Sequence, residues 1–271
     1  MSTAYRSLLF VPGARADRFN KAAASGADAI IIDLEDAVLP GEKVAARSAA
    51  LAWLGSYTGE VVAGLRINSP RTADGCADIA ALAGLARKPA FIMVAKAETP
   101  EDIEIVAEAL ATRQIIAVIE SGRSLSNAYA IGREARAGLL FGGADYSANL
   151  GADLSDWDAL LMARATIAAA GAAGGVPAYD VPFLEVADTG GLEAATRRSR
   201  ALGMSGRACI HPSQVAPVNS VFSPSAAEAD AARALLGAAA ASGAGAVLFN
   251  GKLVDRPVIL AAQRLIDRAG G

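Results

Sequence analysis

Two acidic residues, Glu120 and Asp145, lie just beyond the ends of short apolar segments of this 271-residue chain. The segments, 115–119 and 138–141, have the length of buried strands, and neighbouring strands lie about 4.8 Å apart. Two carboxylates at such a separation repel each other unless a cation or a proton lies between them. Mg²⁺ accepts one or two carboxylates together with water and substrate oxygens. The pair therefore indicates a Mg²⁺ site, with two solvated acids at loop ends as the alternative.

Arg66 belongs to a further apolar segment, residues 61–67. Its planar guanidinium could hold a substrate carboxylate or an enolate oxygen with two parallel hydrogen bonds. It could equally pair with Asp33 or Glu35, which close or follow the segment 29–33. Both interpretations can hold together, since these acids lie on the expected neighbouring strand.

A local basic cluster lies near the start of the chain and consists of Arg6, Arg15, Arg18 and Lys21. These residues surround the turn Pro12-Gly13 and the start of an expected helix, an arrangement suited to phosphate binding. A solvated helix face is the alternative. The chain as a whole has a formal net charge of −3, so no general basic field attracts nucleic acid.

Three other side chains, those of Lys96, His211 and Cys209, are of types that can take part in catalysis. Lys96 could form a Schiff base with a carbonyl substrate if its pKa were depressed, but the nearby Glu98 favours a salt-bridged lysine. His211, the single histidine, stands before Pro212 and is expected to contact a ligand more than to transfer protons. Cys209 is expected to be an inert core thiol. One histidine and two cysteines are too few for a zinc site and favour a reduced cytosol.

Eight short apolar segments must position these residues, and amphipathic stretches separate most of them. The segments are 7–11, 29–33, 61–67, 91–95, 115–119, 138–141, 176–179 and 206–210. This alternation predicts an α/β fold of the (β/α)8 TIM-barrel type, in which residues at the carboxyl ends of strands face the active site. Asp180 and His211, after the last two segments, are therefore expected at the same edge. An open doubly wound sheet is the alternative, but no G-x-G-x-x-G motif follows the first segment.

A break falls near Phe222, where Ser223-Pro224-Ser225 begins a new unit. Ser225 and Glu228 match a capping box at the start of an Ala-rich helix. We expect residues 1–222 to form the catalytic barrel and residues 223–271 to form a small helical lid that takes part in oligomerisation.

Composition narrows the class of protein. Hydrophobic residues make up 53% of the chain, enough for a sizeable core. The longest uncharged stretch, 234–251, contains several glycines and is not expected to span a membrane. We therefore expect a cytosolic enzyme without a nucleic-acid or membrane partner.

Seven short motifs follow one another in the order found in a known enzyme family. They are 6–13 (RSLLFVPG), 33–38 (DLEDAV), 65–68 (LRIN), 119–121 (IES), 143–146 (GADY), 210–214 (IHPSQ) and 251–255 (GKLVD). With these motifs the sequence resembles the HpcH/HpaI aldolase–citrate lyase family, and within it the citrate lyase β-subunit-like proteins and the malyl-CoA lyases. It departs from the family at residues 95–98 (AKAE), where Pro-Lys-Ala-Glu is frequent, and it is shorter than typical malyl-CoA lyases.

The resemblance implies a TIM barrel with a C-terminal lid, assembled into trimers or hexamers. It implies Mg²⁺ on Glu120 and Asp145, and Arg66 at the acyl portion of the substrate. Asp255 matches a lid aspartate that reaches the active site of a neighbouring subunit, although a helix N-cap before Arg256-Pro257 is the alternative. The residues implied to contact coenzyme A are Phe10, Arg15 and Lys21, and those implied to contact the substrate are Ala144, Asp145, Ile210 and His211.

The implied reaction is Mg²⁺-dependent cleavage of a β-hydroxyacyl-CoA thioester into acetyl-CoA and an α-keto acid. Arg66 would stabilise the developing enolate, and Asp255 would exchange a proton with the acetyl carbon. Three other functions stay open: a citrate lyase β subunit that cleaves a citryl group on acyl-carrier protein, a pyruvate aldolase that acts on free acids, and a non-catalytic acyl-CoA-binding protein.

Overall fold

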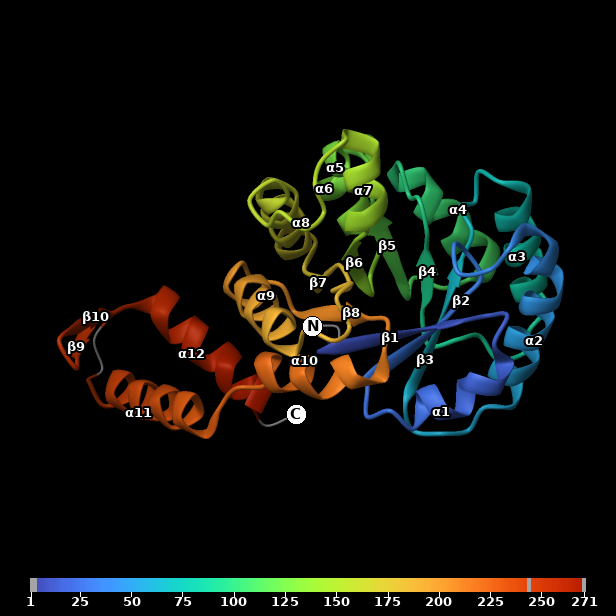
Figure 1. Cartoon of the computed structure of the whole chain (residues 1–271). Helices are drawn as coiled ribbons and strands as arrows, with labels where there is room; N and C mark the ends of the chain where they lie inside the picture. Colours follow the sequence, from blue (N-terminus) through green and yellow to red (C-terminus); the bar gives the residue numbers. More distant parts are fainter. Residues whose placement is uncertain (1–3, 243–244, 270–271) are drawn as a thin grey trace. The chain divides into compact units, whose positions relative to one another are not determined.

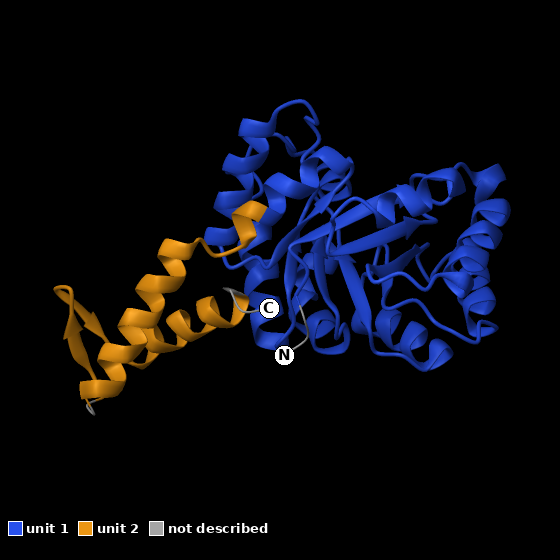
Figure 2. Ribbon diagram, turned by 90° about the horizontal axis from the view of Figure 1, so that it is seen from below, with its two compact units in different colours: residues 1–219 blue, residues 220–271 orange. Residues whose placement is uncertain are grey.

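The computed structural model of the chain describes residues 4–242 and 245–269. The chain divides into two compact units, residues 1–219 and residues 220–271 (Figure 2). The first unit carries the predicted metal ligands and Arg66, and the second carries Asp255. The role of the second unit as a lid and oligomerisation segment stays a prediction.

Eight parallel strands close into a barrel, because β1 pairs with both β2 and β8 (Figure 1). The strands are β1 (Ser7–Pro12), β2 (Ala29–Asp33), β3 (Val62–Ile67), β4 (Ile92–Val94), β5 (Ile115–Ile119), β6 (Gly138–Phe141), β7 (Ala178–Asp180) and β8 (Gly206–Cys209). Each overlaps one of the eight apolar segments. The closure confirms the predicted (β/α)8 barrel, and the alternative of an open sheet is wrong.

Helices follow the strands and lie around the outside of the barrel (Figure 1). They are α1 (Phe19–Ala23), α2 (Lys43–Ser56), α3 (Ala73–Ala83), α4 (Pro100–Leu110), α5 (Gly122–Ser126), α6 (Ala128–Glu134), α7 (Gly143–Leu150), α8 (Leu161–Gly174), α9 (Thr189–Ala201) and α10 (Val215–Phe222), with short 3₁₀ turns at Ala16–Arg18, Pro40–Glu42 and Pro212–Gln214. Helix α4 begins with a capping box between Thr99 and Asp102 and with Pro100 in its first turn. The segment Ser155-Asp156-Trp157-Asp158 is typical of a helix start, but α8 begins only at Leu161. The Asp156 carboxylate instead accepts hydrogen bonds from the N–H groups of Asp158 and Ala159 and holds a turn.

The interior of the barrel is filled by apolar side chains that recur at every second strand position. Examples are Ala29 and Ile31 on β2 and Ile116 and Val118 on β5, all within one buried cluster. The same alternation, continued by two residues, places Asp33 and Glu120 on the inner face at the carboxyl ends of these strands. The barrel thus positions its charged residues above an apolar core.

The second unit contains two helices and a hairpin: α11 (Ala226–Ser242), β9 (Val247–Phe249), β10 (Lys252–Val254) and α12 (Arg256–Ala269). The predicted capping box is present, since Ser225 and Glu228 exchange side-chain and backbone hydrogen bonds at the start of α11. Asn250 and Gly251 both have positive φ, as a tight two-residue hairpin turn requires. No helix among residues 4–242 and 245–269 is both long and apolar enough to cross a membrane.

Candidate active site

A hollow of about 390 Å³ opens among the carboxyl ends of the barrel strands. Charged side chains reach it from the ends of β2, β3 and β5 and from the first turn of α7, whereas Val181, Leu184 and Ile210 contribute an apolar side after β7 and β8. Six residues predicted from the sequence line it: Phe10, Arg66, Glu120, Ala144, Asp145 and Ile210. The structure therefore brings the two candidate metal ligands and the candidate substrate arginine to one place.

Arg66 on β3 meets Asp33, its register partner on β2. Nε lies 2.6 Å from Oδ1 of Asp33, Nη2 lies 2.7 Å from Oδ2, and Nη1 lies 3.1 Å from Oε2 of Glu35. The guanidinium also lies over the ring of Phe10, 4.8 Å from its centroid, which is a cation–π distance. Burial alone would lower the pKa of Arg66, but the carboxylates of Asp33 and Glu35 raise it. Arg66 thus pairs with protein acids and lines the hollow at the same time.

Asp33 also shapes the loop after β2. Its Oδ1 accepts a hydrogen bond from the backbone N–H of Glu35 at 2.9 Å, and its Oδ2 accepts one from that of Ala37 at 3.2 Å. An aspartate that binds backbone groups a few residues ahead folds the chain into a turn. The same carboxylate therefore fixes both the loop and the orientation of Arg66.

Lys96 follows β4 and has a left-handed backbone with φ of 52°, which is uncommon for a residue other than glycine. Its backbone N–H donates to the Glu120 carboxylate, while its ammonium pairs with Glu35 and lies 3.3 Å from Asp36. Burial alone would lower the pKa of Lys96, but the hydrogen bond to Glu35 and the surrounding acids raise it. A lysine held protonated is a poor nucleophile, so the geometry favours the salt-bridged lysine over a Schiff base.

Glu120 is buried at the end of β5, with only 4% of the residue exposed. Burial raises the pKa of its carboxyl to about 8, and the negative charges of Glu35 and Asp145 add to the shift. The hydrogen bond from Lys96 and the charge of Arg66 oppose it only in part. The carboxylate therefore lies in surroundings that still favour an additional positive charge.

Gly142 makes room for Glu120. A Cβ at this position would lie 2.5 Å from the Cβ of Glu120 and 2.7 Å from its Oε2, well inside contact distance. The neighbouring Val118 would also be met at 2.8 Å. The first glycine of the Gly142-Gly143 pair is thus required by the close approach of the acid on β5.

Glu120 and Asp145 could hold a hard cation, whereas Asp33 and Asp36, which also line the hollow, pair with Arg66 and Lys96. No group of three or more His, Cys, Asp or Glu among residues 4–242 and 245–269 is arranged to hold a metal ion. Zinc sites use three or four protein ligands, whereas Mg²⁺ keeps several waters and takes substrate oxygens. Two carboxylates in surroundings that still favour an additional positive charge therefore fit Mg²⁺.

The basic residues after β1 lie outside the lining of the hollow. Arg15 is exposed and pairs with Asp17, with Nη2 2.7 Å from Oδ2. Lys21 is exposed on α1. Both remain on the surface, and their contact with coenzyme A stays a prediction.

His211 has a local structural role. Its Nδ1 accepts a hydrogen bond from the backbone N–H of Ser213 at 3.2 Å and lies 2.7 Å from the Ser213 hydroxyl, so it caps the turn Pro212–Gln214. The ring is exposed and, unlike Ile210, does not line the hollow. Its contact with substrate stays a prediction.

Asp180 does not face the active site, so the expectation that it lies among the strand-end site residues is wrong. Tyr179 occupies the inward position on β7, and the alternation of side chains turns Asp180 to the outer, helix-covered side. There it pairs with Arg164 at 3.0 Å and with Arg207 at 2.5 Å, fully buried. The two arginines hold the pKa of Asp180 below its usual range against the effect of burial.

Asp255 immediately precedes α12. The backbone N–H of Val258 lies 3.5 Å from Oδ1 of Asp255, and Ile259 donates to its carbonyl oxygen. These contacts suit a residue at a helix start, which was the alternative interpretation. Its catalytic role stays a prediction.

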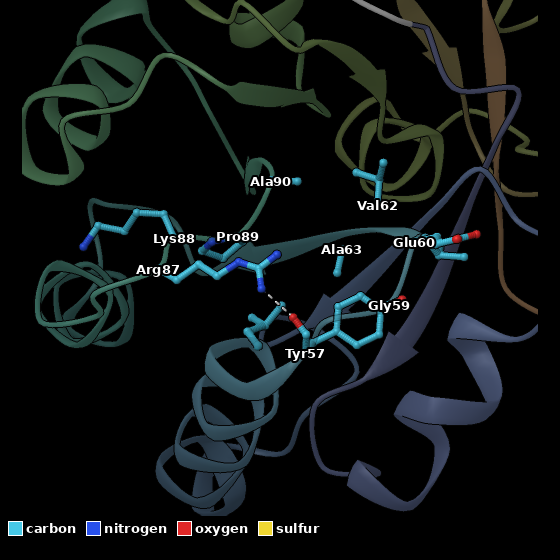
Figure 3. A pocket seen from close by; sticks show the side chains of 11 residues that line it. Tyr57, Gly59, Glu60, Val62, Ala63, Arg87, Lys88, Pro89 and Ala90 are labelled. Atoms are coloured by element: carbon cyan, nitrogen blue, oxygen red, sulfur yellow. Dashed lines mark hydrogen bonds between the residues drawn. The ribbon is translucent and has the colours of Figure 1, made fainter. Parts of the chain in front are cut away.

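A second, smaller hollow of about 180 Å³ lies at the starts of β3 and β4, where the opposite ends of the strands emerge (Figure 3). The Arg87 guanidinium donates to the carbonyl oxygen of Tyr57 at 2.7 Å across its rim. Active sites of β/α barrels lie at the carboxyl ends of the strands. This hollow is therefore separate from the candidate site.

Sequence reasoning missed Lys43, whose ammonium reaches the backbone of the loop that carries Glu35. The sequence did contain a signal, namely a lysine at the first position of a helix, where a positive charge opposes the helix dipole. A lysine at that position is expected only where distant oxygen atoms bind it.

A parallel β/α barrel with an arginine and several acids at its strand ends is the architecture of a TIM-barrel enzyme. Residues 6–212 match the family model described as HpcH/HpaI aldolase/citrate lyase, and the chain belongs to this family. The match confirms the family expected from the seven motifs and, with it, the expected class of lyases.

Similar proteins cover nearly the whole chain. A citrate lyase subunit beta-like protein of Mycobacterium tuberculosis is 38% identical over 269 residues, covering 97% of this chain and 94% of its own. A (3S)-malyl-CoA thioesterase of Cereibacter sphaeroides is 32% identical over 271 residues, covering 98% and 94%. Among solved structures, CitE from M. tuberculosis in complex with magnesium, acetoacetate and coenzyme A has a TM-score of 0.86 at 36% identity over all of both chains.

Proposed function

We propose that this protein is a Mg²⁺-dependent carbon–carbon lyase acting on a β-hydroxyacyl-CoA thioester of the malyl-CoA or citramalyl-CoA type. The products are acetyl-CoA and an α-keto acid. The observation that carries the proposal is the single hollow lined by Arg66, Glu120 and Asp145. The similar CitE structure that contains magnesium and coenzyme A, and the relative named for malyl-CoA, support it.

The metal is assigned to Glu120 and Asp145, which present oxygen ligands in an acidic surrounding. When bound, Mg²⁺ supplies Lewis-acid polarisation of the substrate oxygens. The chain contributes the fixed positions of the two carboxylates: the Lys96 backbone N–H holds Glu120 from one side, and Gly142 leaves it the space it occupies.

Arg66 is assigned the role of stabilising the negative charge that develops on the substrate during cleavage. The bond between the hydroxyl-bearing carbon and the thioester α-carbon breaks, the hydroxyl releases its proton to solvent and becomes a carbonyl group, and the electron pair of the broken bond passes to the thioester enolate. A guanidinium fixed beforehand by Asp33 can stabilise the substrate carboxylate and the enolate without reorganising.

Asp255 is assigned to the remaining proton transfer, in which the enolate carbon gains a proton and becomes the methyl group of acetyl-CoA. The assignment rests on the family resemblance and implies a homo-oligomer, trimeric or hexameric, in which the second unit completes a neighbouring site. Phe10, Arg15 and Lys21 are assigned to coenzyme A, with the two cations serving its phosphates. A cytosolic location is part of the same proposal.

The test is a mass-spectrometric screen of hydroxyacyl-CoA esters with Mg²⁺ and with EDTA. Acetyl-CoA and one keto acid are expected in equal amounts from a single ester, only with the metal. Detection of tight coenzyme A binding with no turnover of any ester would favour a non-catalytic acyl-CoA-binding protein instead.

A second candidate is the β subunit of a citrate lyase, since a relative from Leuconostoc mesenteroides subsp. cremoris named citrate lyase subunit beta is 33% identical over 282 residues. Such a subunit would cleave a citryl group carried on acyl-carrier protein. Cleavage of citryl-acyl-carrier protein together with inertness toward every CoA ester would select this function.

A further inference from the structure

Lys43, the first residue of α2, uses all three of its ammonium donors, two on the loop after β2 and one on Asn68 after β3. Nζ donates to the carbonyl oxygens of Leu34 at 2.9 Å and Glu35 at 3.0 Å, and to Oδ1 of Asn68 at 2.6 Å. An ammonium has three N–H donors, so these contacts use its full capacity. Lys43 thereby joins the segment after β2 to the segment after β3.

The backbone that Lys43 holds carries a central side chain of the site. Glu35 is 4% exposed, and its carboxylate lies between Arg66, at 3.1 Å, and the ammonium of Lys96. Displacement of this carboxylate would remove one ion-pair partner from Arg66, which lines the hollow, and one from Lys96. The position of Glu35 therefore affects the position of Arg66. It also affects Lys96, whose backbone N–H donates to Glu120.

Asn68 is itself held from behind, which makes the Lys43 anchor rigid. Its backbone N–H and its Nδ2 both donate to Oδ2 of the buried Asp78, at 3.0 and 2.7 Å. Asp78 in turn accepts from Nε of Arg47 at 2.6 Å. A chain of satisfied buried polar groups holds its members in one arrangement.

Lys43 is unfavourable for the stability of its own helix, which also indicates that its role lies in its contacts with the loop after β2. A positive charge in the first turn of a helix opposes the helix dipole, and Lys43 stands at the first position of α2, directly after the N-cap residue Glu42. Local helix stability would favour an acid or a neutral polar residue there. The benefit of Lys43 must therefore come from the oxygen atoms it binds at the end of β2.

We propose that Lys43 is a positioning residue of the active site, which sets the place of Glu35 and through it of Arg66 and Lys96. The inference rests on the proposed lyase function for its effect on rate, but its structural part is independent of that function.

Lys88 provides a matched control. Its Nζ also makes three hydrogen bonds to carbonyl oxygens, those of Leu82 at 2.6 Å, Ala83 at 2.9 Å and Leu85 at 3.0 Å. These contacts close the end of α3 beside the hollow at the opposite end of the barrel (Figure 3). Replacing either lysine by methionine removes the same number of lysine–oxygen contacts.

The experiment compares K43M, K88M and the unchanged protein by two measurements. The first is hydrogen–deuterium exchange of the peptide spanning residues 33–39, and the second is lyase turnover with saturating Mg²⁺ and the ester that the screen identifies. K43M is expected to speed exchange of this peptide and to lower kcat about 10- to 100-fold with little change in KM, because a misplacement of about 1 Å can cost that much. K88M is expected to leave the exchange of residues 33–39 and kcat as they are.

Equal losses of kcat in K43M and K88M, or unchanged exchange and kcat in K43M, would overturn the proposal. If no ester is turned over by the unchanged protein, the lyase proposal fails while the exchange comparison still decides the anchoring role. If K43M does not fold, the same comparison is made between K43R and K88R. A planar guanidinium does not reproduce the three hydrogen bonds that an ammonium group donates. Lowered kcat in K43R alone supports the proposal, and unchanged kcat contradicts it.

Discussion

Arg66 and Asp33 are cross-strand partners whose side chains meet in a two-point ion pair with contacts of 2.6 and 2.7 Å. Only 14% of the Arg66 side chain and 2% of the Asp33 side chain are exposed. A bidentate pair of this kind fixes the plane of the guanidinium as well as its location. The orientation of the guanidinium is therefore set by the protein itself.

The first prediction concerns that orientation. R66K keeps the charge but loses the planar fork that matches Asp33, so kcat is expected to fall about 10²- to 10³-fold, the cost of losing one donor to a developing oxyanion. Steady-state kinetics at saturating Mg²⁺ measures the effect. R113K, at an exposed arginine paired with Glu134, serves as the control and should match the unchanged protein. A loss confined to KM would contradict a role in stabilising the transition state.

The second prediction concerns the space beside Glu120. G142A adds a Cβ that would lie 2.7 Å from the Glu120 carboxylate, so the acid must move and weaken both Mg²⁺ affinity and turnover, by about tenfold or more. Calorimetric titration with MgCl₂ measures the affinity. G237A, in α11 where nothing lies near the added atom, should instead raise stability by about 0.5–1 kcal/mol without changing Mg²⁺ binding. Unchanged affinity in G142A would show that Glu120 is not a ligand.

The third prediction concerns pH and the metal-free protein. Burial and the neighbouring acids raise the pKa of Glu120 to about 8 in the folded state, above its value in the unfolded chain. The folded state therefore binds the proton more tightly, and this stabilisation is lost as pH rises through about 8. Thermal unfolding in EDTA should show a Tm that falls from about pH 5 to about pH 9, and E120Q should show less of this fall. Identical pH profiles for the two proteins would contradict the assignment.

The fourth prediction uses the two cysteines. Burial raises the pKa of Cys209 to about 12, so at neutral pH almost no thiolate is present, whereas Cys76 is exposed. Iodoacetamide at about pH 8 should label Cys76 alone in the folded protein and both residues after denaturation. Peptide mass spectrometry reads the outcome, and labelling of Cys209 in the folded protein would contradict its burial in the strand.

The barrel could be predicted from sequence because apolar segments and amphipathic stretches alternate along most of the chain. Glu120 and Arg66 could be placed at the pocket because both stand at the ends of such segments. The prediction that failed concerned Asp180 on β7, a strand of three residues: the sequence did not show whether its side chain points into the barrel or outward. A shift of one residue moves a side chain to the other face, which is why Asp180 lies among the helices beside Arg164 and Arg207.

Tertiary contacts set the remaining limits. Lys43 was not identified because its acceptors, Leu34, Glu35 and Asn68, lie 8 to 25 residues away along the chain. The start of α8 is not evident from the sequence because the Asp156 carboxylate accepts hydrogen bonds from the N–H groups of Asp158 and Ala159 in a turn instead of capping a helix. Both outcomes depend on competition between hydrogen-bond partners, which spacing alone does not resolve.

In the proposed function, Glu120 and Asp145 hold a Mg²⁺ ion that this chain needs to cleave a hydroxyacyl-CoA thioester. The most direct measurement is mass-spectrometric detection of acetyl-CoA and a keto acid from the unchanged protein, from E120Q and from D145N, each with Mg²⁺ and with EDTA. We predict that both products form only in the unchanged protein with Mg²⁺, and that each variant loses at least 10²-fold in rate. Full activity of E120Q, or of the unchanged protein in EDTA, would contradict the account.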